Sequence, residues 1–191
     1  VRVYKYNGSA WTKLGSDIDG EAASDYSGYS VSLSSDGTTV AIGAPVNDGT
    51  ASNAGHVRVY KYIDSAWTKL GNDIDGEAGG DWSGVSVSLS SDGTIVAIGA
   101  DWNDGTAAEA GHVRIYQYNG SAWTKLGSDI DGEAADDYSG IVSLSSDGTI
   151  VAIGAYKNDG TGSDAGHVRV YKYNGSAWTK LGSDIDGEAA D

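Results

Sequence analysis

The sequence predicts an all-β protein built from repeated four-stranded antiparallel sheets. Three observations support this fold class. The stretch NGSAWTKLGSDIDGEA occurs at 7–22, 119–134 and 174–189, with a near copy at 63–78. Short runs of alternating apolar and polar residues are separated by Gly-containing turn dipeptides, which is typical of strands joined by hairpins. No segment shows the apolar period of a helix.

Each repeat contains four predicted strands, which the first complete unit illustrates. The run 30–34 places Val and Leu on one face and Ser on the other. In the run 38–44 one face carries only Ala and Gly besides Thr, which predicts that another sheet packs closely against it. The runs 57–62 and 65–70 complete an antiparallel meander with strand-like alternation.

Turn dipeptides join these strands. Asp-Gly follows the first strand of every complete unit, and Asn-Gly separates the third and fourth strands in most copies. Both dipeptides favour two-residue hairpin turns, because these residues tolerate positive φ. The second copy has Ile63-Asp64 at the Asn-Gly place. A β-branched residue disfavours positive φ, so we expect a different turn there.

The repeat period predicts how the sheets are arranged. Tryptophan recurs about every 56 residues, a period typical of repeat architectures. One such sheet cannot bury both of its faces alone, so we expect propeller-like blades that stack on each other. The predicted units are a half blade at 1–24, holding strands three and four, and blades at 25–80, 81–136 and 137–191. They form an open array of about 3.5 blades, in one repeat domain that we expect to continue beyond both ends.

Two segments carry a family resemblance. SGYSVSLSSDGTTVAIGAP at 27–45 and AGHVRVYKYNG at 165–175 resemble the FG-GAP repeat of integrin-α-like β-propellers, in its bacterial form. Pro45 completes a Gly-Ala-Pro element that the other units keep only as Gly-Ala, and Ser-Gly replaces Phe-Gly throughout. The resemblance implies a β-propeller at the cell surface or outside the cell. The integrin-type calcium hairpin does not carry over, because the corresponding turn is short and holds one acid, Asp36.

Composition excludes several classes of protein. The chain has 27 acidic and 12 basic residues and a formal charge of −15, which argues against binding to a phosphate backbone. It has no cysteine, which excludes disulfides, thiolate metal sites and a cysteine nucleophile. No apolar run is long enough to span a bilayer.

The acids gather in particular loops. In a meander the turns after strands one and three share one edge of the blade, and the longer loops after strands two and four share the opposite edge. Most of the acids lie in these longer loops, where Lys157 is the single basic residue. The sequence therefore predicts one strongly acidic edge, which attracts cations and basic surfaces.

The loops after strand four are candidate Ca²⁺ sites. DIDGEAASD at 17–25 alternates acids around a glycine, and Ca²⁺ takes six to eight oxygen ligands. The alternative is that these acids are solvated loop residues and local caps. No other cofactor is predicted. The candidate ligands are Asp17, Asp19, Glu21, Asp25, Asp73, Asp75, Glu77, Asp81, Asp129, Asp131, Glu133 and Asp137.

Histidine recurs in one setting. His56, His112 and His167 each lie in Ala-Gly-His-Val-Arg at the start of strand three. Because a catalytic site rarely recurs in every blade, we expect structural contacts between blades, with metal ligation and a catalytic triad as alternatives.

Aromatic and sequon residues give further candidates. We expect the repeat tryptophans on strand four to pack beneath the adjacent blade, the alternative being stacking on sugars or on a neighbouring protomer. Trp82 and Trp102 lie in or beside the long loops of one repeat and are candidates for partner binding. Asn7, Asn119 and Asn174 satisfy the N-glycosylation sequon, although turn chemistry alone also explains Asn-Gly.

Three functions are compatible with these features. The first is a non-enzymatic extracellular scaffold or adhesion protein that associates with itself or with neighbouring repeats, including as fibres. The second is a calcium-dependent module that binds a carbohydrate or protein. The third is a hydrolase, which near-identical repeats disfavour because a catalytic pocket draws different residues from different blades. Fold alone does not decide among them.

Overall fold

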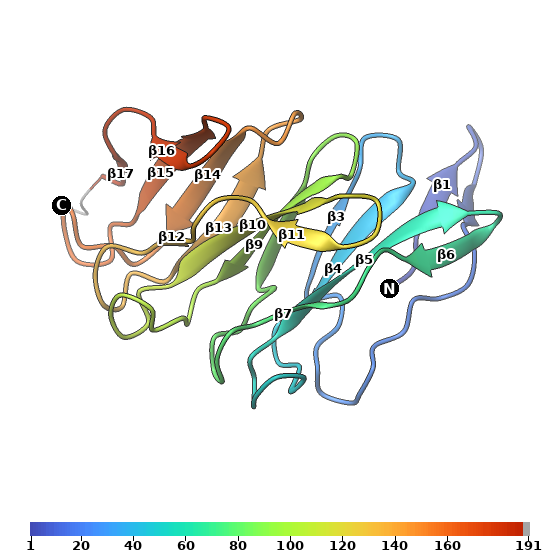
Figure 1. The fold of residues 1–191 in the computed structure, drawn as a ribbon, viewed down its shortest axis with the longest axis horizontal. Helices are drawn as coiled ribbons and strands as arrows, with labels where there is room; N and C mark the ends of the chain where they lie inside the picture. The colour runs from blue at the N-terminus through green and yellow to red at the C-terminus, as the bar shows by residue number, and fades with distance from the viewer. Residues whose placement is uncertain (189–191) are drawn as a thin grey trace.

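The computed structural model describes residues 1–188; residues 189–191, which end the predicted last blade and include Asp191, lie outside the described part. Within residues 1–188 the regular elements are all β-strands (Figure 1). The predicted all-β class is therefore confirmed. No helix in this part of the chain is long and apolar enough to cross a membrane.

Three sheets share one topology, and a hairpin precedes them. In each sheet four consecutive strands form an antiparallel meander, and a fifth, two-residue strand pairs with the third strand. The hairpin comprises β1 (Tyr4–Tyr6) and β2 (Trp11–Lys13). The first sheet comprises β3 (Ser30–Leu33), β4 (Thr39–Ala44), β5 (His56–Ile63), β6 (Ala66–Lys69) and β7 (Ile74–Asp75). The second comprises β8 (Ser86–Leu89), β9 (Ile95–Ala100), β10 (His112–Tyr118), β11 (Trp123–Lys125) and β12 (Ile130–Asp131). The third comprises β13 (Ser139–Leu144), β14 (Ile150–Ala155), β15 (His167–Tyr173), β16 (Trp178–Lys180) and β17 (Ile185–Asp186).

The fourth strand is longer than its sequence pattern indicates. After β6, Leu70 N donates to Val59 O, and Ile74 of β7 then pairs with Val57. Residues 71–73 therefore bulge out opposite a single residue of β5. The same arrangement recurs at β12 and β17, so part of each loop after strand four belongs to the sheet.

The hairpin turns lie where they were expected, but they are not the two-residue type. Ser34 N donates to Thr39 O, and Gly37 N donates back to Ser34 O, so four residues form the Asp-Gly loop. In the Asn-Gly loops the glycine alone takes positive φ, and Asn7 Oδ1 accepts the N–H groups of two following residues. The second copy differs as expected: Asp64 and Ser65 are its positive-φ residues, and Ile63 stays in the strand.

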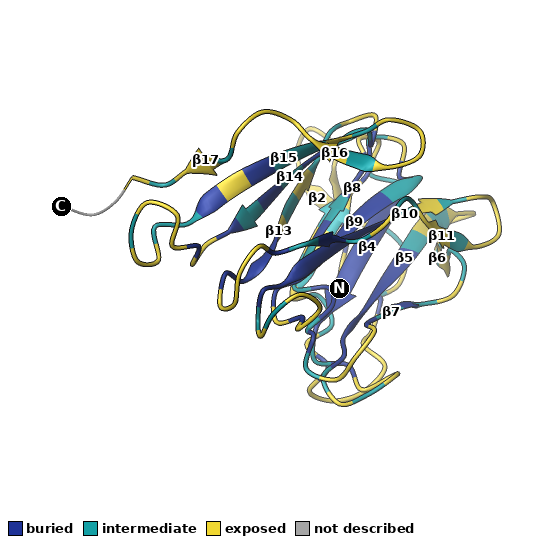
Figure 2. Ribbon diagram, turned by 60° about the vertical axis from the view of Figure 1, so that its left-hand side comes forward, coloured by how far each residue is buried: buried dark blue, intermediate teal, exposed yellow. Residues whose placement is uncertain are grey.

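The apolar cores lie between the sheets. One cluster combines Val57 and Val59 of the first sheet with Val96 and Ile98 of the second. A second cluster joins the second and third sheets in the same way. The most deeply buried strands are accordingly β4, β5, β9 and β10 (Figure 2). Successive blades thus bury the faces at which they meet, as the repeat period predicted.

The Ala/Gly face of the second strand allows its backbone to lie close to the backbone of the next blade. A Cβ placed on Gly43 would lie 2.0 Å from the carbonyl oxygen of Gly84 in the next blade, and one on Gly99 would lie 1.7 Å from Gly140 O. Only glycine fits at such a distance. The expected close packing against the Ala/Gly face is therefore confirmed.

The blades form an open row, and their loops sort by edge. The hairpin and the three sheets follow one another along the long axis of the molecule (Figure 1). Ala44 and Asp75 both pair with His56, so the loops after strands two and four lie at the same edge of the blade. The predicted acidic edge is therefore assembled from these two loops.

Candidate functional site: the joints between blades

We use the term joint for the contact between strand four and the following loop of one blade and strands three and four of the next. In each joint a tryptophan donates a hydrogen bond to a leucine carbonyl of the preceding blade. Trp67 Nε1 donates to Leu14 O, Trp123 Nε1 to Leu70 O, both at 2.8 Å. Trp178 donates to the equivalent leucine at 2.7 Å. The expected packing of these tryptophans against the adjacent blade is therefore confirmed.

An arginine from strand three also donates a hydrogen bond across each joint. Arg114 Nη2 donates to Asp75 O at 2.8 Å, and Nη1 lies 3.5 Å from Glu77 Oε1. The guanidinium also lies over the ring of Tyr116, 5.7 Å from its centroid. Arg58 and Arg169 make the equivalent bonds in the other two joints. All three arginines are buried.

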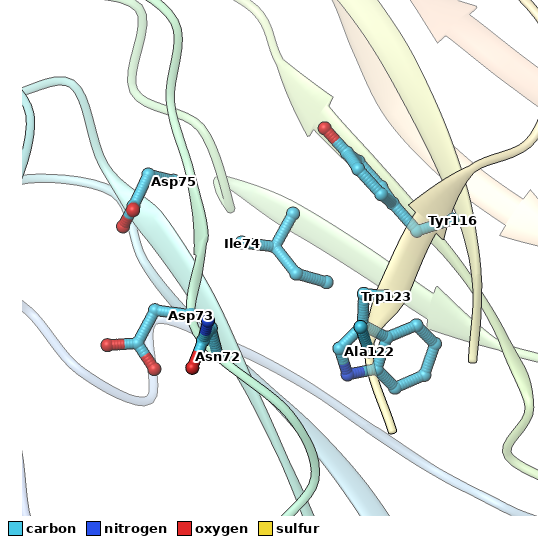
Figure 3. Close-up of a pocket in the computed structure, with 7 residues that line it drawn as sticks. All are labelled: Asn72, Asp73, Ile74, Asp75, Tyr116, Ala122 and Trp123. Carbon is cyan, nitrogen blue, oxygen red and sulfur yellow. The ribbon is translucent and has the colours of Figure 1, made fainter. Parts of the chain in front are cut away.

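A groove runs along each joint. The groove of about 300 Å³ in Figure 3 has Ile74 pointing toward Tyr116 and Trp123, with the carboxylates of Asp73 and Asp75 on the other side of Ile74. Two more grooves have equivalent linings. They are lined by Ser16, Asp17, Ile18, Asp19, Tyr60, Ala66 and Trp67, and by Ser128, Asp129, Ile130, Asp131, Tyr171, Ala177 and Trp178. The site is therefore a repeated one.

The predicted calcium ligands have several different partners in the structure. Lysines on strand four pair with the first acid of each loop, as Lys69 does with Asp73 at 2.7 Å. The last acid of each loop is a buried cap: Asp25 Oδ2 accepts the Ala22 N–H and the Asn47 amide. Asp17, Asp129 and Asp184 follow the first pattern. Asp137 follows the second, and Asp81 Oδ2 accepts the Ala78 N–H. The four acids of one loop do not gather as one group.

Instead the structure brings together acids from two successive loops and a histidine. Glu21, His56 and Asp73 each place one ligand atom within 4.8 Å of the others. The same cluster occurs as Glu77, His112 and Asp129, and as Glu133, His167 and Asp184. In each cluster the glutamate precedes the joint, whereas the histidine and aspartate follow it. We refer to these as the Glu-His-Asp clusters.

The histidine is the buried member of each Glu-His-Asp cluster. His56 and His112 are each 2% exposed, and burial lowers the pKa of both imidazoles. His56 Nδ1 faces Glu21 Oε2 at 4.0 Å. Nε2 of His112 and of His167 has no hydrogen-bond partner in the protein. The expectation that these histidines lie at blade contacts is borne out by their position.

Trp82 and Trp102, predicted as partner-binding residues, stack on each other at the loop edge. Their ring centroids are 5.0 Å apart and the planes differ by 18°. Tyr138 packs edge-on against Trp102 at 5.6 Å and is followed by Tyr156, also at 5.6 Å. Lys157 Nζ lies 4.5 Å from the Tyr138 centroid. We name these four aromatic residues the aromatic ladder.

One buried carboxyl group lies beside the ladder. Asp101, next to Trp102, is 5% exposed and its Oδ1 has no hydrogen-bond partner in the protein. Burial raises the pKa of Asp101 to about 6. The equivalent residues of the other blades are Pro45 and Tyr156, so this carboxyl group breaks the repeat.

The predicted glycosylation sites are accessible. Asn7, Asn119 and Asn174 are all exposed at hairpin turns. Each uses Oδ1 to accept backbone N–H groups of its own turn. Glycosylation itself stays a prediction.

Comparison with known protein families decides among repeat types. Residues 17–60, from the loop after strand four through most of strand three, match the model of the FG-GAP repeat. Residues 17–60 thus form an FG-GAP repeat. The resemblance that rested on Gly43-Ala44-Pro45 is thereby confirmed. A search of curated protein sequences found no match.

Solved structures agree on the fold. A putative 6-phosphogluconolactonase from Bacteroides uniformis superposes with a TM-score of 0.57 at 13% identity, covering 83% of this chain and 40% of its own. Saccharomyces cerevisiae Sqt1 gives a TM-score of 0.52 at 14% identity, covering 84% and 35%. The chain thus spans 40% and 35% of the lengths of these structures. At such identities the likeness concerns the propeller-like fold alone.

The Glu-His-Asp clusters are the feature that sequence reasoning missed. Glu21 and Asp73 belong to different copies of one loop, so a search within a single loop could not pair them. A signal was nevertheless present, because each histidine is followed at constant spacing by the first acid of the next loop, as His56 is by Asp73 and His112 by Asp129.

Proposed function

We propose that the protein is a non-enzymatic extracellular repeat scaffold that associates through the joint. The observation that carries this proposal is the repetition of one joint, closed each time by a tryptophan and an arginine donor. Many equal contacts add up in an assembly even when each is modest. Association with further copies, including as fibres, would use the contact that already joins the blades.

The outermost sheets display the two halves of this contact. Trp11, the counterpart of the joint tryptophans, is 69% exposed, and Leu181, the counterpart of their carbonyl acceptors, is 42% exposed. Apolar side chains accompany them, with Tyr4 exposed on the hairpin and Ile185 on the last sheet. In the proposed assembly Trp11 Nε1 donates to a leucine carbonyl of a neighbouring repeat, and Leu181 O accepts from the tryptophan of another.

Analytical ultracentrifugation of the 191-residue chain tests this proposal. We expect association that grows with protein concentration, and its loss in Trp11→Ala. Trp102→Ala is the matched control, because it removes an exposed tryptophan of the loop edge and should leave association unchanged. A wild-type chain that stays monomeric across the concentration range, or equal association of both variants, would refute assembly through the joint. Electron microscopy then distinguishes fibres from closed rings.

The grooves support the non-enzymatic part of the proposal. Three grooves share one lining, whereas a catalytic pocket combines groups with different roles at one place. The extracellular setting is proposed from the FG-GAP match and from the exposed sequon residues. Intact mass of the native protein before and after deglycosylation checks the sequons.

A second candidate, a carbohydrate- or protein-binding module, is favoured by the aromatic ladder. Stacked indole rings with a partly exposed face suit ligands that present a flat apolar surface. Titration with neutral oligosaccharides, followed by tryptophan fluorescence, tests it, with Trp82→Ala as the site variant. Repeating the titration with a chelator tests whether calcium contributes. A signal that Trp82→Ala leaves unchanged would argue against binding at the ladder.

A further inference from the structure

The Glu-His-Asp clusters contain the ligand types of a transition-metal site. Each offers one imidazole nitrogen and two carboxylates. Zn²⁺ is bound by nitrogen and oxygen donors of this kind, whereas Ca²⁺ prefers sites made entirely of oxygen ligands. The buried histidine is the observation that separates these clusters from ordinary groups of surface acids. His56 is 2% exposed and its Nδ1 faces Glu21 Oε2 at 4.0 Å, beyond hydrogen-bond distance, so a hydrogen bond to the carboxylate does not account for its place.

We propose that each Glu-His-Asp cluster binds a divalent transition-metal ion of the Zn²⁺ type, which links two successive blades. In the middle cluster the ligands are Glu77 from the loop before the joint, and His112 and Asp129 from the blade after it. The remaining coordination position is open to water. This inference does not depend on self-association and goes beyond the scaffold function.

The geometry requires only a small movement. Zn–N and Zn–O bonds of about 2.0–2.2 Å place tetrahedral ligands about 3.3 Å apart, compared with the present separations of up to 4.8 Å. The Glu77 side chain is 46% exposed, so it has room to close this gap by a change of rotamer. His112 is fixed by its position at the start of β10.

Two cations now neighbour the carboxylates, and metal binding would weaken the contact that each of them makes. Lys125 pairs with Asp129 at 2.8 Å, but the lysine side chain is 38% exposed, and such pairs contribute about 0–1 kcal/mol. Arg114 keeps its hydrogen bond to Asp75 O whether or not Glu77 turns toward a metal. The weakening of these two contacts is small beside the coordination of a metal by three ligands.

The test is a titration of tag-free, chelator-treated protein with Zn²⁺ alone, by calorimetry and native mass spectrometry. We expect up to three ions per chain and a melting temperature that rises with Zn²⁺. His112→Gln should remove one ion and leave the other two sites unchanged. Glu77→Gln is the second variant, because its exposed side chain is replaced by an isostere that leaves the fold intact, and it should weaken the same site.

The control variant removes an acid outside the clusters. Asp48 is an exposed residue of the loop edge whose Oδ1 accepts the Asn53 N–H, and Asp48→Asn retains that acceptor. Its Zn²⁺ stoichiometry should equal that of the wild type. Absence of Zn²⁺ binding, or a stoichiometry that both His112→Gln and Glu77→Gln leave unchanged, would overturn the proposal. So would a preference for Ca²⁺ over Zn²⁺, which indicates an all-oxygen site in the loops.

Discussion

Replacing the buried carboxyl group of Asp101 should stabilise the protein at neutral pH. Burial raises the pKa of this group from 3.8 to about 6, so the folded protein holds its proton more tightly than the unfolded chain does. Between these two pKa values stability falls as pH rises, and above pH 6 the full penalty remains. At 1.36 kcal/mol per unit, the penalty is up to about 3 kcal/mol.

Asp101→Asn removes the charge and keeps the shape. We expect the free energy of unfolding to rise by up to about 3 kcal/mol at pH 7.5 and by less than about 1 kcal/mol at pH 4, where the wild-type carboxyl group is protonated in the folded state. The uncharged residues at the same place in the other blades, Pro45 and Tyr156, show that the position needs no charge. Urea unfolding followed by tryptophan fluorescence at the two pH values measures the difference.

Asp36→Asn is the control, because it should change the free energy of unfolding in the opposite direction to Asp101→Asn. Hydrogen bonds from Ser34 and Thr38 lower the pKa of Asp36 to about 2, so its carboxylate stabilises the folded state above pH 4 and loses that effect as the pH falls toward 2. Asp36→Asn should therefore destabilise the protein at pH 7.5. An Asp101→Asn effect that is the same at both pH values, or that is destabilising at pH 7.5, would refute the account of Asp101 as a buried, unpaired carboxyl group.

Three further predictions concern the joints and the fold. Trp123→Phe removes the donor to Leu70 O and should lower the free energy of unfolding by about 1–3 kcal/mol. Trp11→Phe, at an exposed ring, should lower it little. Equal losses of the two variants in urea unfolding would show that the indole hydrogen bond contributes nothing. Gly99→Ala places a methyl group 1.7 Å from a backbone oxygen of the next blade and should prevent soluble folding, whereas at Gly154 the added methyl group meets ordinary contacts of 3.5 Å and the protein should stay soluble. Far-UV circular dichroism should show negligible helix, and a substantial helical signal would refute the all-β fold.

The elements that rest on local pattern were predictable from the sequence. Alternation of Val and Ile with small residues located β4, and the displaced turn at Ile63 followed from the poor fit of a β-branched residue to positive φ. The packing of Trp123 followed from the repeat period, because a blade must bury its faces against neighbours. In these cases the structure follows from the residues of one short segment, or from the need of each blade to pack against its neighbours.

The features that depend on two blades at once could not be predicted in the same way. Strand β7 is separated from β6 by a bulge that interrupts the alternation, so the loop looked unstructured. The joining of Glu21 with His56 and Asp73 depends on the distance and angle between successive sheets, which periodicity does not supply. The burial of Asp101 likewise arises from the blade that covers it, whereas its sequence setting is that of a loop acid.

The joint has a direction and a generic acceptor, and this bears on how the gene can change. The tryptophan and arginine donors of each joint lie on the later blade, and each of them reaches a main-chain carbonyl on the earlier one, which each residue type supplies. A unit that is copied within the gene therefore meets the same carbonyl acceptors on its neighbour without any compensating substitution. Repeat number is free to lengthen or shorten by recombination between copies, and the near-identity of the copies is the sequence record expected of such a process.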